Sequence, residues 1–306
     1  MSIEVLDHTL RLSELEEKII YDDEIIFTSG VDLEERARQP LWGEIASRNL
    51  GRVVYLDSIG DESCELSIDG TITSNLQLRD LEGIGRVIGG RPLLLDITGL
   101  SHDVWAPIVR YLKMEKCPFR VAYSEPEEYS VNLAPSSENI FDLSLNVEGV
   151  KPLPGFAKFA DADDYDSQLL VSLLGFEGDR PLRIVLEFDP IPKVIPVVGV
   201  PGFQLNYPSY TVSCNRKFIR EYFLHSQVRY ARASCPFSLY DSLQQIMVDN
   251  PRSYMNIAMV GTKPHALGAV IFALDNEGST ELIFDHPVKK PGRSSGVGTI
   301  HIYHFA

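Results

Sequence analysis

The feature that most constrains the fold of this chain is a regular alternation of short apolar segments with longer segments of helical character. Helix-like segments of roughly 10 to 15 residues separate the apolar ones, and this alternation is typical of a doubly wound, mainly parallel sheet with right-handed crossovers. We therefore expect an α/β protein. The clearest apolar segments are RPLLLDITG (91–99), FRVAYSEP (119–126), QLLVSLLGF (168–176), KVIPVVGVP (193–201) and YMNIAMVG (254–261).

The length of the chain and one change of character predict two domains. The 306 residues are about twice an ordinary domain, and 44% hydrophobic residues suffice for a core in each half. A proline-containing stretch without sustained periodicity lies in the middle and indicates a connecting segment, with a strand such as IFDLSL embedded in it. We expect a Rossmann-like half over residues 1–130, a connecting segment over 131–166 and a second Rossmann-like half over 167–306.

Four further elements follow from local patterns. An acid-rich start and apolar spacing predict a helix over 31–49, interrupted at Pro40, and the alternating stretch 59–73 predicts a small antiparallel insertion that turns at Asp69 and Gly70. Residues 76–87 have helical character. The last segment, TIHIYHF (299–305), alternates apolar and polar residues and is expected to be an edge-type strand of the second half.

Two matched pairs of segments indicate an internal duplication. The stretch from Gly99 to Pro126 spans 27 positions and matches that from Gly261 to Pro287, which spans 26. Likewise, 30–36 (GVDLEER) and 175–180 (GFEGDR) each place an acid-Arg pair after a strand that ends in glycine. The glycine offsets between the halves, 145 and 162 residues, are similar. A duplication accounts for both matches, and the alternative is that any two Rossmann-like domains share strand-Gly-helix turns.

Composition excludes several classes of function. A net charge of -15 opposes broad binding to nucleic acid, which needs clustered Lys and Arg. The four cysteines form no C-x-x-C pair, so neither a metal site nor a disulfide framework is indicated. No uncharged apolar run reaches the roughly 18 to 20 residues of a membrane span, and the charged start MSIEVLDHTLRLSELEEK is unlike a signal peptide. We expect a cytoplasmic, acidic protein that does not enter a membrane.

The motifs of common enzymes and cofactor sites are missing from the sequence. There is no G-x-S-x-G elbow, no H-E-x-x-H and no Ser-His-Asp order, so hydrolase and metal mechanisms have no support. The glycine-rich stretch EGIGRVIGG (82–90) does not place G-x-G-x-x-G directly after a strand. No dinucleotide or other cofactor is therefore predicted, and the sequence leaves open whether the protein is an enzyme.

The strongest candidate for a binding site is VGTKPHALG (260–268). A glycine closes a strand there, Thr262 and Lys263 follow, and Pro264 is suited to begin a helix, whose amino terminus attracts anions. The spacing is not that of a P-loop. The alternative is an ordinary turn with an exposed lysine. The one dense basic cluster, in DHPVKKPGRSSG, would complete an anion pocket or else form a solvated loop. The candidate ligand-binding residues of this half are Gly261, Thr262, Lys263, Lys289, Lys290 and Arg293.

Other candidates lie at further strand ends. In the first half, Thr98 and Ser101 would suit a hydroxyl-rich or basic group such as a ribose or nucleobase. The acid-Arg pairs could face a ligand or could complement helix dipoles. An acid or a histidine at a strand end could transfer a proton. These secondary candidates are Glu35, Arg36, Asp179 and Arg180, with Glu125, Asp285 and His286 as candidate catalytic residues.

The two strand-end loops, TGLS (98–101) and GTKP (261–264), and the strands that end in acid-Pro or His-Pro resemble the core of CRISPR-associated Rossmann-fold (CARF-like) sensor domains. Such domains bind small signalling nucleotides across a twofold axis and commonly serve prokaryotic antiviral defence. The resemblance implies roles in ligand binding for Thr98, Gly99 and Ser101 and for Gly261, Thr262 and Lys263.

We therefore expect a Rossmann-like protein that binds or senses a nucleotide-like anion, in a prokaryotic antiviral defence system. Two alternatives stay open. One is an enzyme that acts on a nucleotide or nucleoside, and the other is a non-catalytic subunit of a larger complex, with a protein partner.

Overall fold

A computed structural model divides the chain into two compact units. Unit 1 comprises residues 1–129 and 291–306, and unit 2 comprises residues 130–290. The chain therefore leaves unit 1 once and returns to it for its last residues. The helix expected over 31–49 lies largely outside the described residues. The structure describes residues 8–10, 23–30, 34–37, 42, 47, 52–60, 62–68, 71–157 and 165–305.

Unit 1 is built on a mixed eight-stranded sheet. Its four central strands, β7, β6, β2 and β3, are parallel, and antiparallel strands extend the sheet on both sides. In spatial order the strands are β1 (His8–Leu10), β17 (Ile300–Phe305), β7 (Phe119–Ser124), β6 (Leu93–Asp96), β2 (Ile25–Ser29), β3 (Val53–Ser58), β4 (Ser63–Ile68) and β5 (Thr71–Gln77).

The helices α3 (Leu81–Ile88) and α4 (His102–Met114) lead into and out of β6. Asp80 caps α3, because its carboxylate accepts a hydrogen bond from the backbone N–H of Gly83, and Gly89 ends the helix at φ 64°. Trp105 and six other residues of α4 are buried, so this helix contributes a large part of the core of unit 1.

Unit 2 contains a fully parallel five-stranded sheet. Numbered along the chain from β10, its strands lie in the order 3-2-1-4-5, which doubly wound nucleotide-binding sheets also have. The direction of winding reverses between β10 and β13. In spatial order the strands are β12 (Arg229–Ala231), β11 (Lys193–Gly199), β10 (Ser167–Leu173), β13 (Ser253–Met259) and β14 (Thr280–Ile283).

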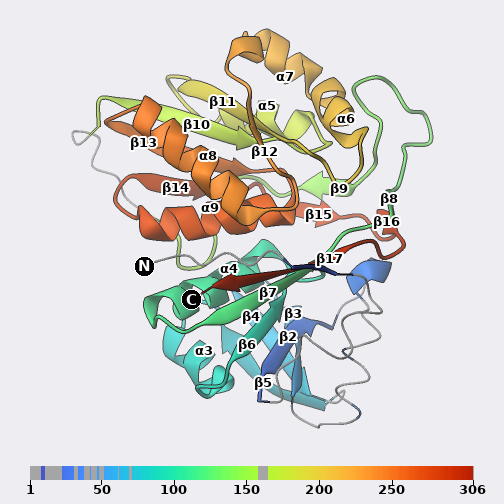
Figure 1. Cartoon of the computed structure of the whole chain (residues 1–306), viewed down its shortest axis with the longest axis vertical. Coiled ribbons are helices and arrows are strands. Elements are labelled where there is room, and N and C mark those ends of the chain that lie inside the picture. The colour runs from blue at the N-terminus through green and yellow to red at the C-terminus, as the bar shows by residue number, and fades with distance from the viewer. Residues whose placement is uncertain are drawn as a thin grey trace. The chain divides into compact units, whose positions relative to one another are not determined.

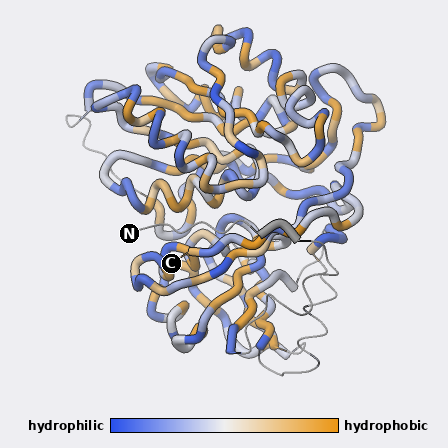
Figure 2. The backbone as a smooth tube through the Cα atoms, viewed as in Figure 1, coloured by the Kyte–Doolittle hydropathy of each residue, from blue (hydrophilic) through white to orange (hydrophobic). Residues whose placement is uncertain are grey.

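Helices cover both faces of this sheet, as Figure 1 shows, with α5, α6 and α7 on one side and α8 and α9 on the other. β10 and β13 are buried over most of their length, and Figure 2 shows hydrophobic stretches in both strands and helices of the chain. On the first face, Leu170, Val198 and Phe218 belong to one apolar cluster. The helices are α5 (Asp179–Val185), α6 (Tyr207–Cys214), α7 (Arg216–Glu221), α8 (Pro236–Asp249) and α9 (Lys263–Asp275).

The α/β class expected from the sequence is confirmed, and three local expectations need correction. The last strand, β17, pairs with β7 in the sheet of unit 1 and is buried between β7 and β1, so it is neither part of the second half nor an edge strand. The helix expected over 76–87 begins only at Leu81, because β5 continues to Gln77. The stretch expected to connect the halves over 131–166 contains a strand, β9 (Ser144–Val147), which pairs with β15 (Pro287–Lys289), and just before it β8 (Glu128–Tyr129) pairs with β16 (Ser294–Ser295).

Candidate functional site

In an open parallel sheet, ligands bind beyond the carboxyl ends of the strands at the point where the winding reverses. In unit 2 this point lies between β10 and β13, so the loops that follow Leu173 and Met259 are the place to look.

These two loops are in direct contact through their backbones. A Cβ added to Gly175 would lie 2.4 Å from the carbonyl oxygen of Val260, and one added to Gly261 would lie 3.1 Å from that of Leu173. Gly175 is therefore required for the close approach of one loop to the other, and a Cβ at Gly261 would make a tight contact there.

The Thr262 to His265 stretch packs against the loop that follows β12. The Thr262 hydroxyl donates to the Ala233 carbonyl at 2.8 Å and accepts from the His265 N–H at 3.3 Å, which caps α9. Lys263 is only 7% exposed. The side chain of His265 is 1% exposed, its Nε2 lies 3.0 Å from the Arg232 carbonyl oxygen, and burial lowers its pKa to about 4. These side chains thus make internal contacts at the start of α9.

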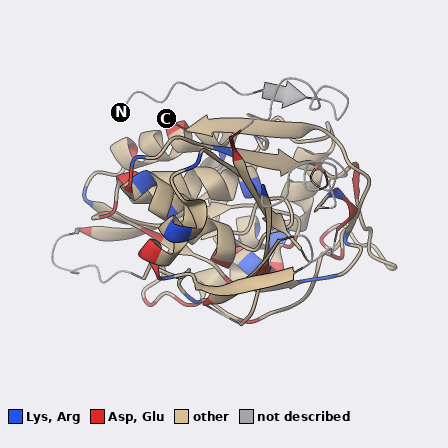
Figure 3. Cartoon of the chain, turned by 90° about the horizontal axis from the view of Figure 1, so that it is seen from below, with Lys and Arg blue, Asp and Glu red and all other residues tan. Residues whose placement is uncertain are grey.

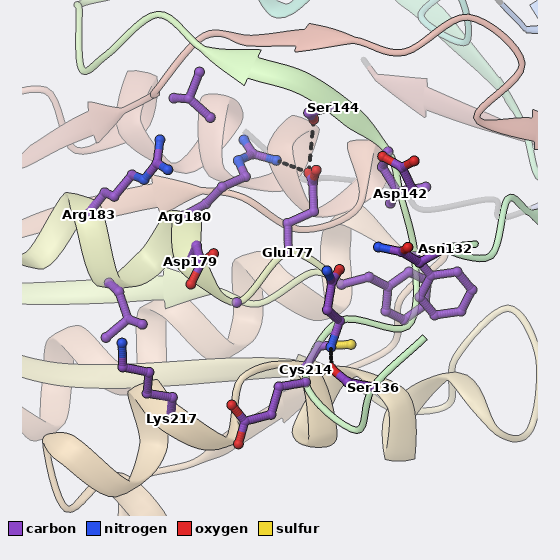
Figure 4. A pocket seen from close by; sticks show the side chains of 18 of the residues that line it. Asn132, Ser136, Asp142, Ser144, Glu177, Asp179, Arg180, Arg183, Cys214 and Lys217 are labelled. Carbon is purple, nitrogen blue, oxygen red and sulfur yellow. Dashed lines mark hydrogen bonds and ion pairs between the residues drawn. The ribbon is translucent and has the colours of Figure 1, made fainter. Parts of the chain in front are cut away.

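A cavity of about 570 Å³ lies next to the Gly175 loop. Its walls come from the start of α5, from the junction of α6 and α7, and from residues 132–147 of the segment that precedes β10. Figure 4 shows this cavity from close by. The sequence pattern predicts a connecting segment over 131–166 and does not indicate that this segment supplies a cavity wall.

Two contacts fix the shape of the cavity. A Cβ on Gly178 would lie 1.9 Å from the Cys214 carbonyl oxygen, so only glycine fits where the β10–α5 loop crosses the α6–α7 junction. The amide of Asn215, at the same junction, donates to the Gly175 carbonyl at 2.7 Å. The Cys214 thiol also lines the cavity, and burial raises its pKa, which disfavours the reactive thiolate.

One cation at the cavity, Arg180, forms two ion pairs. Arg180 donates two hydrogen bonds to Asp285, at 2.8 and 2.6 Å, and a third to Glu177 at 3.2 Å. Glu177 also accepts a hydrogen bond from Ser144 (Figure 4). Burial by itself would lower the pKa of Arg180, but the hydrogen bonds and charge of Asp285, together with Glu177, raise it. This guanidinium is a fixed structural charge.

Two other cations line the same cavity without an ion pair or hydrogen bond in the described part of the chain. They are Arg183 of α5 and Lys217 of α7, both exposed, and in Figure 4 they lie on the opposite side of the view from Asn132 and Asp142. Such side chains are available to an anionic ligand. The sequence did not single them out, although Arg183 lies one helical turn beyond the predicted Arg180.

The remaining walls are aromatic and polar. Phe141 stacks on Phe176 with ring centroids 4.3 Å apart, and both line the cavity. Ser136, Asn132 and Asn139 add hydroxyl and amide groups to the wall. A planar aromatic group would find stacking partners and hydrogen-bonding groups in the same space.

The basic cluster predicted near residue 290 is divided between the two units. Lys289 lies in β15, and the Lys290 ammonium contacts the carboxylate of Asp142, one of the lining residues. Arg293 belongs to unit 1, where it binds Glu34 at 2.7 Å. Figure 3 shows Lys and Arg interspersed with Asp and Glu along the ribbon.

In unit 1, the predicted residues make contacts within the fold. The Thr98 hydroxyl, which is 0% exposed, accepts from the Ser124 N–H at 3.0 Å, whereas the buried Ser101 hydroxyl has no hydrogen-bond partner among the described residues. Glu35 accepts from the Gly296 N–H at 2.9 Å. Arg36 is buried and binds Glu34, the Tyr123 hydroxyl and the Ser124 carbonyl.

Of the three acid–base candidates, Glu125 is the one that contacts a histidine within the described part of the chain. Its carboxylate lies 2.5 Å from Nε2 of His301 in β17, and Nδ1 of His301 is buried without a partner there. Asp285 is held by Arg180, and Nε2 of His286 lies 3.0 Å from the Lys151 carbonyl oxygen. The Glu125–His301 pair was not predicted, because β17 was assigned to the second half.

No protein family model matches the chain, and no curated protein matches it in sequence. No ligand or reaction is therefore carried over from another protein. Within the described residues, no helix is both long and apolar enough to cross a membrane. The same part of the chain contains no group of His, Cys, Asp and Glu side chains placed to hold a metal ion.

Proposed function

We propose that the protein binds a nucleotide-like anion in the cavity of unit 2 at the carboxyl end of β10. The observation that carries this proposal is that Arg183 and Lys217 line a cavity of about 570 Å³ with no ion pair between them and any described residue. The proposed function is ligand binding rather than catalysis.

Two features support a nucleotide-like ligand over a simple anion. The cavity is lined by the loop that follows β10, the first strand of a sheet in the 3-2-1-4-5 order, and doubly wound proteins bind phosphorylated ligands beyond the carboxyl ends of their strands. Phe176 lines the cavity and is half-buried, so it offers a partner for a planar base, while the cations suit the phosphate.

The proposal moves the site away from the Thr262–Lys263 loop. Burial of Lys263 and the bond from Thr262 to Ala233 weaken the case for a ligand on that loop. Of the predicted residues, Asp179 and Arg180 line the cavity, and Lys290 contacts the lining residue Asp142.

Isothermal titration calorimetry with AMP, ADP, ATP and a cyclic dinucleotide tests the proposal, with adenosine as the uncharged control. At least one of the phosphorylated probes is expected to bind, and more tightly than adenosine does. The variants Arg183→Gln and Lys217→Gln are each expected to weaken binding about tenfold, since charge-assisted hydrogen bonds contribute roughly 1.5 to 3 kcal/mol. Arg216→Gln is the matched control, because Arg216 is exposed on α7 but does not line the cavity.

Two results of these titrations would contradict the proposal. Affinities unchanged in both cavity variants, or no binding by any of the four probes, would show that this cavity is not the site. A product formed from the nucleotide by the wild type and lost in Glu125→Gln would replace the binding protein by the enzyme alternative.

The internal duplication belongs to the same proposal. The parallel strands of unit 1 lie in the order β3-β2-β6-β7, and β11-β10-β13-β14 of unit 2 correspond to them in chain order and in position. Arg36 reaches the end of β7, and Arg180 reaches Asp285 just beyond β14. This correspondence supports two diverged copies. A role in prokaryotic antiviral defence rests on the resemblance to CARF-like sensor domains.

A further inference from the structure

A second cavity in unit 2, of about 710 Å³, lies on the side of the sheet where the strands begin. Ser167 and Gln168 of β10, Lys193 of β11 and Tyr254 of β13 line it. Because the strands are parallel, these residues lie toward the edge of the sheet opposite to the carboxyl end of β10. The cavity shares no lining residue with the first one.

One wall of this second cavity is apolar. It is formed by the segment between α5 and β11, which contributes Phe188, Pro190, Ile191 and Pro192, and by Val150. Ile191 is 51% exposed and Val150 is 37% exposed, so large apolar side chains face solvent there. Such a wall favours a ligand with a hydrophobic body.

The charges around the cavity are mainly negative. Three lining residues are acidic, namely Asp166, Glu187 and Glu281, and Lys193 is the one basic residue that lines it among those described. Asp166 is paired with Arg252 at 3.0 Å, and Lys193 donates to Asn250. The Glu187 carboxylate has neither an ion pair nor a hydrogen bond to a described residue.

A buried phenol completes the site. Tyr254 is 5% exposed, and its hydroxyl has no hydrogen-bond partner among the described residues, which is costly for a buried polar group. Its ring packs edge-on against Tyr165 with centroids 5.1 Å apart. Burial, with the nearby Glu281 and Tyr165, raises the pKa of Tyr254 to about 12, so the phenol is neutral at pH 7 and able to donate.

We propose that this second cavity binds an organic cation with an apolar or aromatic body, such as an arylalkylamine. The ammonium group would lie near Glu187 and Glu281, where carboxylates attract it, and near the tyrosine rings, whose faces attract cations. The body would pack on the apolar wall at Ile191, and a polar substituent would reach the Tyr254 hydroxyl. The site is independent of the nucleotide-binding proposal.

Calorimetry with 2-phenylethylammonium chloride tests this site, and 3-phenylpropionate is a control of similar size and opposite charge. The amine is expected to bind at least about tenfold more tightly than the carboxylate, because the lining carboxylates repel the latter. Glu187→Gln is expected to weaken amine binding about threefold, as for an exposed ion pair. Glu221→Gln, an exposed glutamate of α7 away from the cavity, is expected to leave it unchanged.

Tyr254→Phe separates a ligand-binding role from a structural one. Probes with and without a polar ring substituent, tyramine and 2-phenylethylammonium, are compared. The variant removes a hydroxyl that has no partner among the described residues, so its urea midpoint is expected to hold or rise. The wild type is expected to bind tyramine more tightly than 2-phenylethylammonium, and in the variant the ratio of the two affinities is expected to fall about threefold or more.

Three outcomes would overturn the proposal. They are equal binding of amine and carboxylate, no amine binding up to about 10 mM, and unchanged affinities in both cavity variants. Nucleotide binding in the other cavity would be unaffected by any of these results, so the two proposals fail separately.

Discussion

The stability of the protein should depend on pH through one buried histidine. His265 is 1% exposed at the start of α9, and burial lowers its pKa from 6.5 to about 4. The Arg232 carbonyl can only accept, so Nε2 carries the proton and donates, which leaves Nδ1 as the atom that would gain a proton in acid. Nδ1 is buried and makes no hydrogen bond to a described residue, and burial outweighs the favourable effect of the Arg232 and Ala231 backbones, so protonation would place a charge in the core at a net cost.

The sign and size of the effect follow from linkage. The folded pKa lies below the unfolded one, so the unfolded chain binds more protons between pH 6.5 and pH 4, and stability falls as the pH falls through that window. One pKa unit corresponds to about 1.36 kcal/mol, which gives a loss of about 2 kcal/mol between pH 7 and pH 5 and about 3 kcal/mol by pH 4.

Urea unfolding followed by far-UV circular dichroism at pH 7, 6, 5 and 4.5 measures this loss. Carboxylates also titrate in acid, so the decisive quantity is the difference between the wild type and His265→Gln, which keeps an N–H donor and does not titrate. Below pH 6 the variant should lose less stability than the wild type. His225→Gln, on an exposed residue, controls for loss of a histidine. Parallel curves for the wild type and His265→Gln would refute the reasoning.

Two further predictions concern the cavity at the carboxyl end of β10. Gly178→Ala would place a Cβ 1.9 Å from the Cys214 carbonyl oxygen and should cost about 3 kcal/mol or more and weaken ligand binding, whereas Gly278→Ala meets no atom within 4 Å and should change the urea midpoint little. Arg180→Met leaves the 2%-exposed Asp285 without its ion-pair partner and should lower the free energy of unfolding in urea by about 3 to 5 kcal/mol. Arg220→Met, at an exposed position, should lower it by less than about 0.5 kcal/mol. Similar losses of stability in the two variants would contradict the role of the ion pair.

Local patterns predicted most of the strands and helices of unit 2, because strands there are continuous apolar runs bounded by glycine or proline. The runs over 193–201 and 254–261 correspond to β11 and β13 with ends displaced by two residues or fewer. Turn chemistry is local, and so Thr262 at the start of α9 was also recognisable.

The prediction that β17 belongs to the second half is wrong for a physical reason. Its alternating pattern indicates a strand but carries no information on which sheet it joins, and proximity in sequence favoured the second half. Pairing with β7 brings together residues more than 170 positions apart, such as Tyr123 and His301. The Glu125–His301 pair could not be predicted without this pairing.

The cavity at the carboxyl end of β10 was beyond local patterns for the same reason. Its walls combine 132–147 with α5 and α7, and the segment 132–147 has little regular structure of its own. Whether a charged side chain forms an ion pair also depends on residues that are distant in the sequence. Lys290 and Arg293 look available in the sequence but bind Asp142 and Glu34, whereas Arg183 has no such partner among the described residues.

The acid-Arg pairs that recur in the two halves are best explained as parts of the scaffold. Arg36 ties the loop after β2 to the end of β7, and Arg180 ties the loop after β10 to Asp285 beyond β14. Arg36 donates four hydrogen bonds and Arg180 donates three to internal acceptors, so most of their N–H groups are already engaged. Specificity would instead come from Arg183 and Lys217, which line the cavity and make no ion pair or hydrogen bond with a described residue. Substitutions at the recurring arginines should therefore lower stability first, and substitutions at the two unpaired cations should lower ligand affinity with the fold intact.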